Sequence, residues 1–394
     1  MYEENSNEIM HPLWDMNVLY DSFKKSMKGS AWKNEPQRFE GLYLIELNHL
    51  RKELMEHTYQ TSEGTEFTLN ERGHIRYIHG GRMRDRVVRH ALCDNIINPA
   101  LQPYLIYNNG ASQKGKGMKF ARDEFEKDLH NFYLEYGSND GYIVFADFSK
   151  FYDNIQHELA KEFMYPLIDY ESQWLFSEVL KSFEVDVSYL SDEEYADCIN
   201  KKFNSIEYHE TIDESQMTGE KMMPKSVDIG DQVSQSIGVS FPTRVDNYVK
   251  IVLGVKRYGR YMDDMYAICK TKEEAKRIVD GIIKSAEEIG LFVNKDKTYI
   301  SKLSGKYTYL QIKYSLNEKG KVIKRINPKS VTRERRRLKK YKSLLDRGKM
   351  AYEDIKQSYK SWMGDFSRIM SKRQIKNMKE LYKDLFGEDV RWKK

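Results

Sequence analysis

RYGRYMDDMYAI, residues 257–268, carries the strongest structural signal in the 394-residue chain. Two short apolar arms flank the pair Asp263-Asp264, which predicts a β-hairpin with both carboxylates at its tip. Residues 142–146 form a continuous apolar run, as expected of a buried strand, and Asp147 follows directly. If this strand and the hairpin are neighbours in one sheet, three carboxylates converge at its edge.

Apolar stripes on both sides of the hairpin predict helices that cover this sheet. Apolar residues recur at helical spacing over residues 275–289, and Gly290 follows as a C-terminal cap. A second stripe covers residues 233–252, on a helix bent near Pro242. Strand, helices, hairpin, helix and strand together predict an α+β layer, with helices on one face of a small antiparallel sheet.

Three converging carboxylates need a positive partner, because like charges at short range cannot all stay ionised. Mg²⁺ is the natural partner for an all-oxygen site with free positions for phosphate and water, and Mn²⁺ is a substitute. Two such ions stabilise the attacking and leaving oxygens of an in-line phosphoryl displacement. An isolated Asp-Asp pair most often occurs simply because aspartate favours turns. The neighbouring motifs must therefore decide between a plain turn and a metal site.

The composition is that of a folded, strongly charged protein, with 40% hydrophobic and 32% charged residues. No run of about 18 apolar residues occurs, and the acidic N-terminus lacks an apolar segment, which argues against a membrane protein and a secretory signal. The three cysteines lie far apart, which argues against a disulfide framework or a zinc site. We therefore expect a reduced, cytoplasmic protein without membrane contact.

Charge is distributed unevenly along the chain. Residues 327–394 contain 21 Lys and Arg against 9 Asp and Glu, whereas residues 166–220 contain 3 against 14. A basic C-terminal segment beside an acidic body indicates that a polyanion is held at one end and excluded elsewhere. A solvated pair of charged helices explains the C-terminal charge equally well when charge is considered alone.

The hairpin motif and its neighbours resemble those of reverse transcriptases. Tyr261-Met-Asp-Asp264 matches the YxDD box of that family, and further motifs agree with it in order and spacing over about residues 70–315. GHIR at 73–76 and RDRVV at 84–88 look like the fingers motifs of bacterial intron-type enzymes, and NGASQKGKG at 109–117 occupies the place of their template-contacting loop. The later motifs are VFADFSKFYDNI at 144–155, DIGDQVSQ at 228–235, GLFVNKDKT at 290–298 and the primer-grip segment YTYL at 307–310.

The resemblance implies an α+β right-hand polymerase with fingers, a ferredoxin-like palm and a helical thumb. Residues 1–110 would form the N-terminal region and fingers, residues 111–315 the fingers and palm with an acidic insertion at 171–225, and residues 316–394 the basic helical thumb. The implied activity is that of an RNA-directed DNA polymerase, which extends a primer 3′-OH with dNTPs on an RNA template by two-metal-ion catalysis.

The resemblance also assigns roles around the metal ions. Asp147 and Asp263 would hold both Mg²⁺ ions, Asp264 would support them, and Phe148 would lend its backbone carbonyl to one ion. Tyr152 falls where the family places the aromatic gate that excludes a ribose 2′-hydroxyl, so the product should be DNA.

The incoming nucleotide would be bound by residues from several motifs. Arg76 and Arg72 would clamp the triphosphate, since a planar guanidinium suits phosphate oxygens, although plain surface charge is the competing interpretation. Lys297 would lie near the pyrophosphate and neutralise or protonate the leaving group. Gly230, preceded by Ile229, would let the backbone approach the nascent base pair, which a Cβ would obstruct.

Template and primer contacts are implied for the 109–117 loop, the 228–235 motif, the primer grip and the thumb. The residues are Lys114, Lys116, Ser234, Gln235, Tyr309, Leu310, Arg333, Arg336, Arg337 and Lys340. On the thumb, basic groups would face the phosphates of a template–primer duplex, with aromatic residues packing behind them. The primer grip reads Leu310-Gln311 where the family usually has Leu-Gly.

Two biological roles are compatible with the resemblance. The motifs Ile229-Gly230 and Ser234-Gln235 resemble those of diversity-generating retroelements, whose enzymes copy a template RNA with errors at adenines. The lengthened palm and the lack of endonuclease or maturase motifs favour a bacterial anti-phage defence enzyme that works with a dedicated, structured non-coding RNA. The acidic insertion would dock a basic accessory protein or a second copy of the chain, or would be a solvated insertion without a role.

Two other functions stay open at this point. One is a nucleic-acid-binding scaffold whose polymerase site has decayed, although the intact motif aspartates argue against it. The other is untemplated or protein-primed DNA synthesis, in which a Tyr or Ser hydroxyl supplies the primer, and the 28 tyrosines of the chain do not exclude it.

Overall fold

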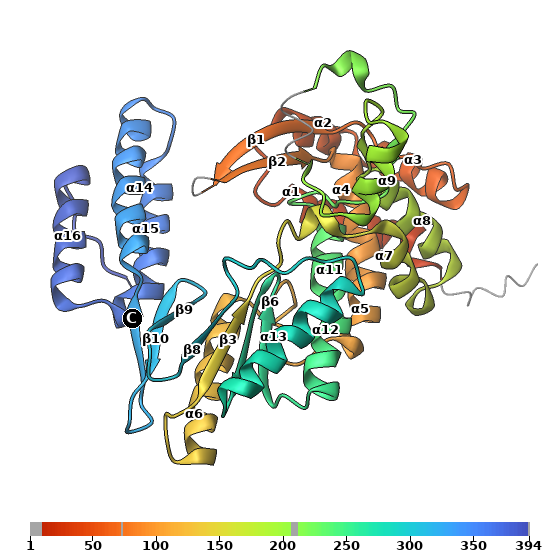
Figure 1. Cartoon of the computed structure of the whole chain (residues 1–394). Helices are drawn as coiled ribbons and strands as arrows, with labels where there is room; N and C mark the ends of the chain where they lie inside the picture. The colour runs from red at the N-terminus through yellow and green to blue at the C-terminus, as the bar shows by residue number, and fades with distance from the viewer. Residues whose placement is uncertain (1–9, 72–73, 206–211, 393–394) are drawn as a thin grey trace, which may run out of the picture. The chain divides into compact units, whose positions relative to one another are not determined.

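The computed structural model describes residues 10–71, 74–205 and 212–392, which form two units (Figure 1). Unit 1 comprises the residues up to Gly117 together with residues 144–267 and 276–299. Unit 2 comprises residues 118–143, residues 268–275 and the residues from Ile300 onward. The three regions expected from the sequence do not coincide with these two units, and that division stays a prediction.

A four-stranded sheet carries the predicted acidic residues. Its strand order is β6-β7-β3-β8, and the strands are β6 (Arg257–Tyr261), β7 (Asp264–Cys269), β3 (Tyr142–Ala146) and β8 (Tyr299–Lys302). β6 and β7 form the predicted hairpin around Met262-Asp263, and β3 matches the predicted buried strand residue for residue. Both sequence predictions are confirmed, as is the proximity of the strand and the hairpin, because β7 and β3 are hydrogen-bonded neighbours.

The two apolar stripes form helices as predicted. α13 (Lys272–Glu287) carries the stripe that begins at Ala275, and Gly290 follows with a φ of +70°, which a residue without Cβ adopts at little cost. The second stripe covers α11 (Gln232–Ser240), α12 (Thr243–Asn247) and the π-helical turn η7 (Tyr248–Val252). Pro242 separates α11 from α12, which confirms the predicted bend.

The N-terminal part of unit 1 is helical and carries a second hairpin. Asp15 caps α1 by accepting a hydrogen bond from the Asn17 amide at 2.7 Å, and the Glu35 carboxylate accepts one from the Met83 amide at the start of α4. The elements are η1 (Pro12–Trp14), α1 (Met16–Met27), α2 (Asn34–Gly41), α3 (Tyr43–Met55), β1 (Thr65–Glu71), β2 (His74–Gly80), α4 (Met83–Leu92), the π-helical turn η2 (Cys93–Ile97), α5 (Asn98–Leu101) and η3 (Gln102–Tyr104). β1 and β2 pair antiparallel, from Thr65 opposite Gly80 to Glu71 opposite His74.

Between β3 and α11, unit 1 contains packed helices and a small subdomain. The elements are η4 (Tyr152–Asn154), α7 (His157–Met164), η5 (Tyr165–Leu167), α8 (Tyr170–Lys181), β4 (Val185–Asp186), α9 (Asp192–Asn200), η6 (Glu214–Gln216) and β5 (Met222–Met223). α8 lies inside the expected acidic insertion, yet Leu175, Phe176 and Val179 are fully buried. The part of the insertion that lies outside this packing is therefore shorter, and we call its described residues, 185–205 and 212–223, the β4–β5 subdomain.

Unit 2 combines helices with a three-stranded sheet of order β11-β10-β9. Its elements are α6 (Met118–Tyr136), β9 (Tyr307–Tyr309), β10 (Ile312–Leu316), β11 (Val322–Ile326), α14 (Pro328–Asp346), α15 (Tyr352–Phe366), η8 (Ser367–Ile369) and α16 (Lys372–Phe386). Figure 1 shows α14, α15 and α16 side by side in blue. The prediction that the chain is helical from about residue 327 is confirmed, since α14 begins at Pro328 after the N-cap Asn327.

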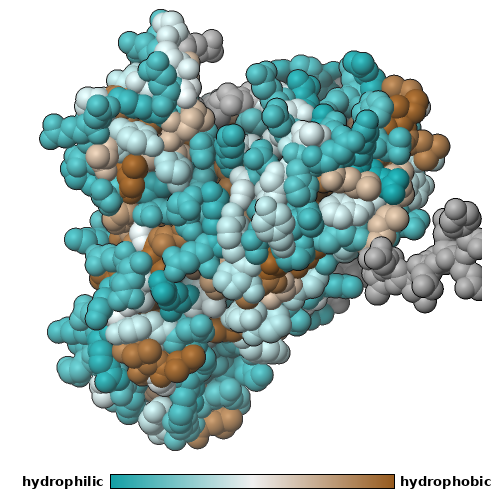
Figure 2. Space-filling model, turned by 90° about the vertical axis from the view of Figure 1, so that its right-hand side faces the viewer, coloured by the Kyte–Doolittle hydropathy of each residue, from teal (hydrophilic) through white to brown (hydrophobic). Residues whose placement is uncertain are grey.

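The visible surface is mostly hydrophilic, as the face in Figure 2 shows. Within the described residues, none of the helices is both long enough and apolar enough to cross a bilayer.

Candidate active site

The YxDD turn is held by a buried arginine on β6. Met262 lies in this turn with a φ of +55°, and its carbonyl accepts a hydrogen bond from Arg260 Nη1 at 3.1 Å. Arg260 is fully buried and forms an ion pair with Asp246, with 2.7 Å between Nη2 and Oδ2. It also donates to the carbonyl of Val239 on α11 at 2.7 Å. The turn that carries Asp263 is thereby fixed to α11 and α12.

Asp147 occupies the end of β3 and is 3% exposed. Burial, followed by the charge of Asp263, raises the pKa of Asp147 to about 7. The pKa of Asp264 is raised to about 6, first by desolvation and then by Asp263. Both shifts mean that Asp263 lies close enough to disfavour the charged forms of Asp147 and Asp264. The structure therefore brings the three predicted acids within electrostatic range of one another.

Lys297 supplies a cation to this group. Its Nζ lies 2.5 Å from Asp147 Oδ2. Burial lowers the pKa of the Lys297 ammonium, but the bond to Asp147 and the charges of Asp147, Asp263 and Asp264 outweigh burial, and the net shift is upward. The backbone explains this placement: the Asn294 amide donates to the Asp147 carbonyl at 2.7 Å, and Phe148 forms an isolated antiparallel bridge with Val293.

Tyr152 lies on the short turn η4 that follows β3. Its hydroxyl is 3.1 Å from the position that a Cβ on Gly238 would occupy, so the ring packs closely against α11 and a larger residue at 238 would push it by a few tenths of an ångström. Burial and, after it, the charge of Asp263 raise the pKa of Tyr152 to about 12, and the charge of Arg76 on β2 opposes this rise. These couplings place Asp263, Tyr152 and Arg76 in one neighbourhood. Arg72, which was predicted to bind the triphosphate, lies outside the described residues.

The loop before α11 forms part of the wall of a cavity of about 990 Å³. Gly230 has a φ of +101°, and the next residue, Asp231, caps α11 by accepting from the Val233 amide at 2.8 Å. The other oxygen of Asp231 is paired with the buried Arg89. The cavity is lined by the cationic side chains Lys28, Lys33, Arg82 and Arg86, by the apolar Phe67 and Ile78, and by Ile229, Gly230 and Gln235.

The predicted template residues of unit 1 lie in different environments. Ser234 is fully buried, and its hydroxyl has no hydrogen-bond partner within the described part of the chain. Gln235 is exposed and accepts from the Ser112 hydroxyl at 3.5 Å. Lys114 is exposed, whereas the Lys116 ammonium donates to the carbonyls of Tyr107 and Asn109 within its own loop.

The predicted primer-grip residues lie on the β9–β10 hairpin of unit 2. Tyr309 is buried against Phe125 of α6, with 4.7 Å between the ring centroids. Leu310 lies at the turn, and its carbonyl accepts two hydrogen bonds from Arg122 of α6, at 3.0 Å from Nε and 2.6 Å from Nη2. The guanidinium of Arg122 also lies over the ring of Phe366, 5.6 Å from its centroid.

The basic residues predicted on the C-terminal segment lie on α14. Arg336 and Lys340 are exposed, while Arg337 is paired with the buried Glu334 at 2.6 Å. Arg333 donates to the hydroxyl of Ser330 on its own helix at 3.3 Å. The four residues therefore present unequal amounts of charge to solvent.

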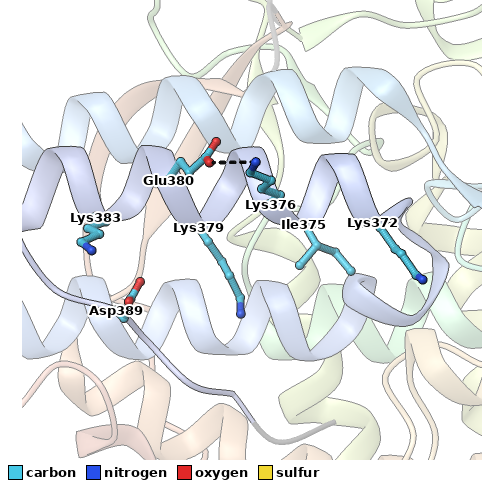
Figure 3. A pocket seen from close by; sticks show the side chains of 7 residues that line it. All are labelled: Lys372, Ile375, Lys376, Lys379, Glu380, Lys383 and Asp389. Carbon is cyan, nitrogen blue, oxygen red and sulfur yellow. Dashed lines mark ion pairs between the residues drawn. The ribbon is translucent and has the colours of Figure 1, made fainter.

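A second basic surface, on α16, was missed by the sequence interpretation. Its four lysines are exposed and recur with helical spacing: Lys372, Lys376, Lys379 and Lys383. Figure 3 shows them along a groove of about 490 Å³ that also includes Ile375 and Asp389. Lys376 forms an ion pair with Glu380, with 3.7 Å between Nζ and Oε1. The spacing of these lysines is readable in the sequence, and we name them the α16 lysine stripe.

Asp147 is the residue that best fits a role as a ligand of a divalent metal ion. Among the described side chains, no group of three or more His, Cys, Asp or Glu is arranged to hold a metal ion. Lys297 reaches one oxygen of the buried Asp147 carboxylate, Oδ2, and the other oxygen, Oδ1, accepts no hydrogen bond from the described residues. Buried carboxylate oxygens in this state are suitable ligands for Mg²⁺, which prefers hard oxygen donors.

Carboxylates and cations that converge in this way suit the active site of a nucleotidyltransferase, an enzyme that transfers a nucleotide to a hydroxyl acceptor. The family model of the reverse transcriptases (RNA-dependent DNA polymerases) matches residues 72–314. Because this match covers more than half of the chain, the protein belongs to the reverse transcriptase family and is an RNA-directed DNA polymerase. A comparison with curated proteins found no match.

Family membership establishes the coarse features of the chemistry. The family has a right-hand polymerase fold, with which the mixed helices and sheets of this chain agree. Its substrates are a nucleic-acid template and primer with dNTPs, and its members generally use divalent metal ions. The predicted family and enzyme class are therefore confirmed.

Proposed function

We propose that this protein extends a primer 3′-OH with dNTPs on an RNA template by two-metal-ion catalysis at Asp147 and Asp263. The observation that carries the proposal is the placement of Asp147 beside Asp263 and Lys297, with Tyr152 and Arg76 in the same neighbourhood. Unit 1 would supply the fingers and most of the palm, and the C-terminal helices of unit 2 would supply the thumb.

The side chains of the site have separate tasks in this proposal. Asp147 and Asp263, with support from Asp264 and the Phe148 carbonyl, would hold two Mg²⁺ ions, which when bound supply positive charge to the attacking and leaving oxygens. Arg76 would bind the triphosphate. Lys297 would turn from Asp147 to the pyrophosphate and stabilise or protonate it.

Nucleotide selection would depend on shape. The Tyr152 ring is fixed against Gly238 and would exclude a ribose 2′-hydroxyl by contact. At Gly230, the positive φ and the missing Cβ leave the backbone free to approach the nascent base pair.

Template and primer would be bound through their backbones. In unit 1, the cavity at Gly230 combines cationic side chains with Phe67 and Ile78, a mixture that suits phosphates and unpaired bases. In unit 2, the exposed charges of α14 and the α16 lysine stripe would face the phosphates of the duplex. Leu310 at the β9–β10 turn would contact the primer.

The biological role that we favour is anti-phage defence in the cytoplasm of a bacterium, with a dedicated structured non-coding RNA as template. The second candidate is mutagenic copying for a diversity-generating retroelement. Ile229 favours this second role, because an apolar side chain at the Gly230 cavity lacks the hydrogen bond that would check a template base.

Primer extension tests the catalytic proposal. The purified chain, a DNA primer annealed to an RNA template, dNTPs and Mg²⁺ should give full-length product, and Asp263→Asn should lower kcat by about 10³-fold or more, because it removes an anionic metal ligand. Asp280→Asn on α13 is the matched control and should retain activity, since Asp280 is exposed. Extension by Asp263→Asn at the wild-type rate would overturn the assignment.

Sequencing of the cDNA made in cells separates the two roles. Products that map faithfully to one small RNA support defence, and substitutions confined to template adenines support the retroelement role. Product that is covalently attached to the protein would instead identify protein-primed synthesis.

A further inference from the structure

The β4–β5 subdomain (residues 185–205 and 212–223) has its own small core. Val185, Val187, Phe203 and Met223 are buried together, with Tyr189, Leu190, Tyr195, Cys198 and Ile199 packed against them. The strands β4 and β5 pair antiparallel, with Val185 opposite Met223. Such a core indicates a defined structure rather than a solvated loop.

The subdomain is tied to the turn that carries Tyr152 through the buried Asn154. The Asn154 Nδ2 donates to the Phe203 carbonyl at 3.1 Å, and its Oδ1 accepts from the Phe203 amide at 2.8 Å. The same Nδ2 donates to the Lys150 carbonyl at 2.8 Å. Asn154 is fully buried, and its amide therefore joins the η4 turn to residue 203 in one fixed orientation.

The remaining residues of the turn are held in the same way. Asp153 Oδ1 accepts from the Ser205 hydroxyl at 2.9 Å. The Tyr152 carbonyl accepts from the Val227 amide at 3.1 Å, and the Ile155 carbonyl accepts from the Ser226 amide at 3.1 Å. All four consecutive residues 152–155 are therefore hydrogen-bonded to the subdomain or to the strand-like segment that leaves it.

That departing segment is anchored to the subdomain by a buried lysine. The Lys225 ammonium donates to the carbonyls of Cys198 at 3.2 Å and Lys201 at 2.9 Å, at the C-terminal end of α9. Lys225 is 1% exposed and immediately precedes Ser226. A cation at a helix C-terminus interacts favourably with the carbonyls and the helix dipole. The position of α9 is thereby linked to the Ser226 and Val227 amides and, through them, to Tyr152.

We propose that the β4–β5 subdomain positions the Tyr152 ring and thereby sets the discrimination between dNTPs and rNTPs, with Asn154 as the main positioning residue. This inference rests on the proposed role of Tyr152 as the gate. Exclusion of a 2′-hydroxyl by a ring demands that the ring be held to a fraction of an ångström, and a short 3₁₀ turn does not supply that rigidity by itself. The subdomain bonds Asp153 and Asn154 directly, and the segment that leaves it bonds Tyr152 and Ile155.

Steady-state incorporation of one dNTP and of the matching rNTP on a defined RNA template and DNA primer tests this inference. Asn154→Ala should lower the ratio of kcat/KM for dNTP over rNTP by about tenfold, mainly through a higher KM for dNTP and better use of rNTP. The kcat at saturating dNTP should change much less, because Asn154 is fully buried and is not among the residues proposed to hold the metal ions or the nucleotide. Asn200→Ala is the matched control, since Asn200 is an exposed asparagine on α9 that donates to the Ala196 carbonyl of its own helix.

A double-mutant cycle separates a positioning role from general damage. In a Tyr152→Ala background, adding Asn154→Ala should change the ratio no further, because the ring through which Asn154 acts is absent. Ser205→Ala, which removes one peripheral hydrogen bond, gives a milder variant that should fold and should shift the ratio in the same direction. Unchanged discrimination in both Asn154→Ala and Ser205→Ala, when Tyr152→Ala alone admits ribonucleotides, would overturn the inference and leave the gate intact. Unchanged discrimination in Tyr152→Ala would overturn the gate assignment and the inference together.

Discussion

Arg260 carries a charge that solvent does not reach. All three guanidinium nitrogens donate: Nε and Nη2 to the Asp246 carboxylate, and Nη1 and Nη2 to carbonyls of α11 and of Met262. A buried charge is tolerated only when such partners replace the lost water. This side chain therefore links the stability of unit 1 to the conformation of the turn that carries Asp263.

Replacement of Arg260 tests this linkage. Arg260→Leu should destabilise the protein by about 3–5 kcal/mol, because Asp246 would remain buried without a countercharge. Urea unfolding followed by circular dichroism measures the loss. The double variant Arg260→Leu/Asp246→Leu should recover part of it, since neither charge is then left buried. A double variant that is less stable than Arg260→Leu would contradict this account.

The turn between β9 and β10 has an unusual sequence for its geometry. Tyr309 is paired with Ile312, so Leu310 and Gln311 form a two-residue turn, and their φ angles are +41° and +73°. Positive φ at both positions is typical of a type I′ turn, for which glycine or asparagine is preferred. The two hydrogen bonds from Arg122 to the Leu310 carbonyl hold this strained conformation.

Glycine at this turn should stabilise the protein. Gln311→Gly should raise the free energy of unfolding by about 0.5–1 kcal/mol, since relief of the left-handed backbone strain exceeds the added chain entropy of glycine. Thermal or urea unfolding gives the value. Gln311→Ala keeps a Cβ and should give no gain; equal stabilisation by both substitutions would show that the backbone conformation is not the cause.

The buried Lys225 at the C-terminal end of α9 should make the free energy of unfolding depend on pH. Burial lowers the pKa of Lys225 from 10.5 to about 8. Between these values the unfolded chain binds the proton and the folded chain has released it, so stability rises with pH. This contribution is about 3 kcal/mol at full extent and is lost as the pH falls through 10.5 towards 8.

Comparison with Lys225→Met isolates this contribution. The free energy of unfolding of the wild type should rise relative to that of Lys225→Met when the pH is raised from neutrality to about 10, because the methionine side chain does not titrate. Urea unfolding at a series of pH values measures the difference. If the free energies of unfolding of the two proteins change in parallel with pH, the Lys225 ammonium keeps its ordinary pKa in the folded state.

The sequence predicted the elements that are determined by local pattern. The β6–β7 hairpin, β3 and the stripe of α13 follow from periodicity over a few residues, and the structure confirms them. Contacts between distant residues left no such signal. Asn154 bonds Phe203, 49 positions away, and Arg122 bonds Leu310, 188 positions away. The acids of the candidate site were predictable because their motif is local, whereas the groups that hold them in place were not.

The net charge of the whole molecule is small, but positive charge is concentrated on particular surfaces. The chain carries a net charge of +5, yet the α16 lysine stripe alone places four cations on one face of a helix. A polyanion bound there releases counterions, so its affinity depends steeply on salt.

Neutralisation of the stripe should flatten this dependence. The quadruple variant Lys372→Gln/Lys376→Gln/Lys379→Gln/Lys383→Gln should reduce the slope of log affinity against log salt by about 2–4 for a template–primer duplex. Fluorescence anisotropy at several salt concentrations measures it. The matched control removes four exposed cations of α13, by changing Lys272, Lys276, Arg277 and Lys284 to Gln, and should leave the slope nearly unchanged. Equal effects of both variants would show that binding follows total charge.

The ion pair between Lys297 and Asp147 has a consequence for the order of assembly. The lysine acts as a counter-ion that the chain carries with it, 2.5 Å from the most buried of the three acids. Repulsion among the acids is thus relieved during folding by a group that cannot diffuse away. The chain can therefore fold without a bound metal ion. We expect a chelator to leave the melting temperature of the protein unchanged. On this account, a divalent ion held by these acids would serve the reaction and would not be needed for folding.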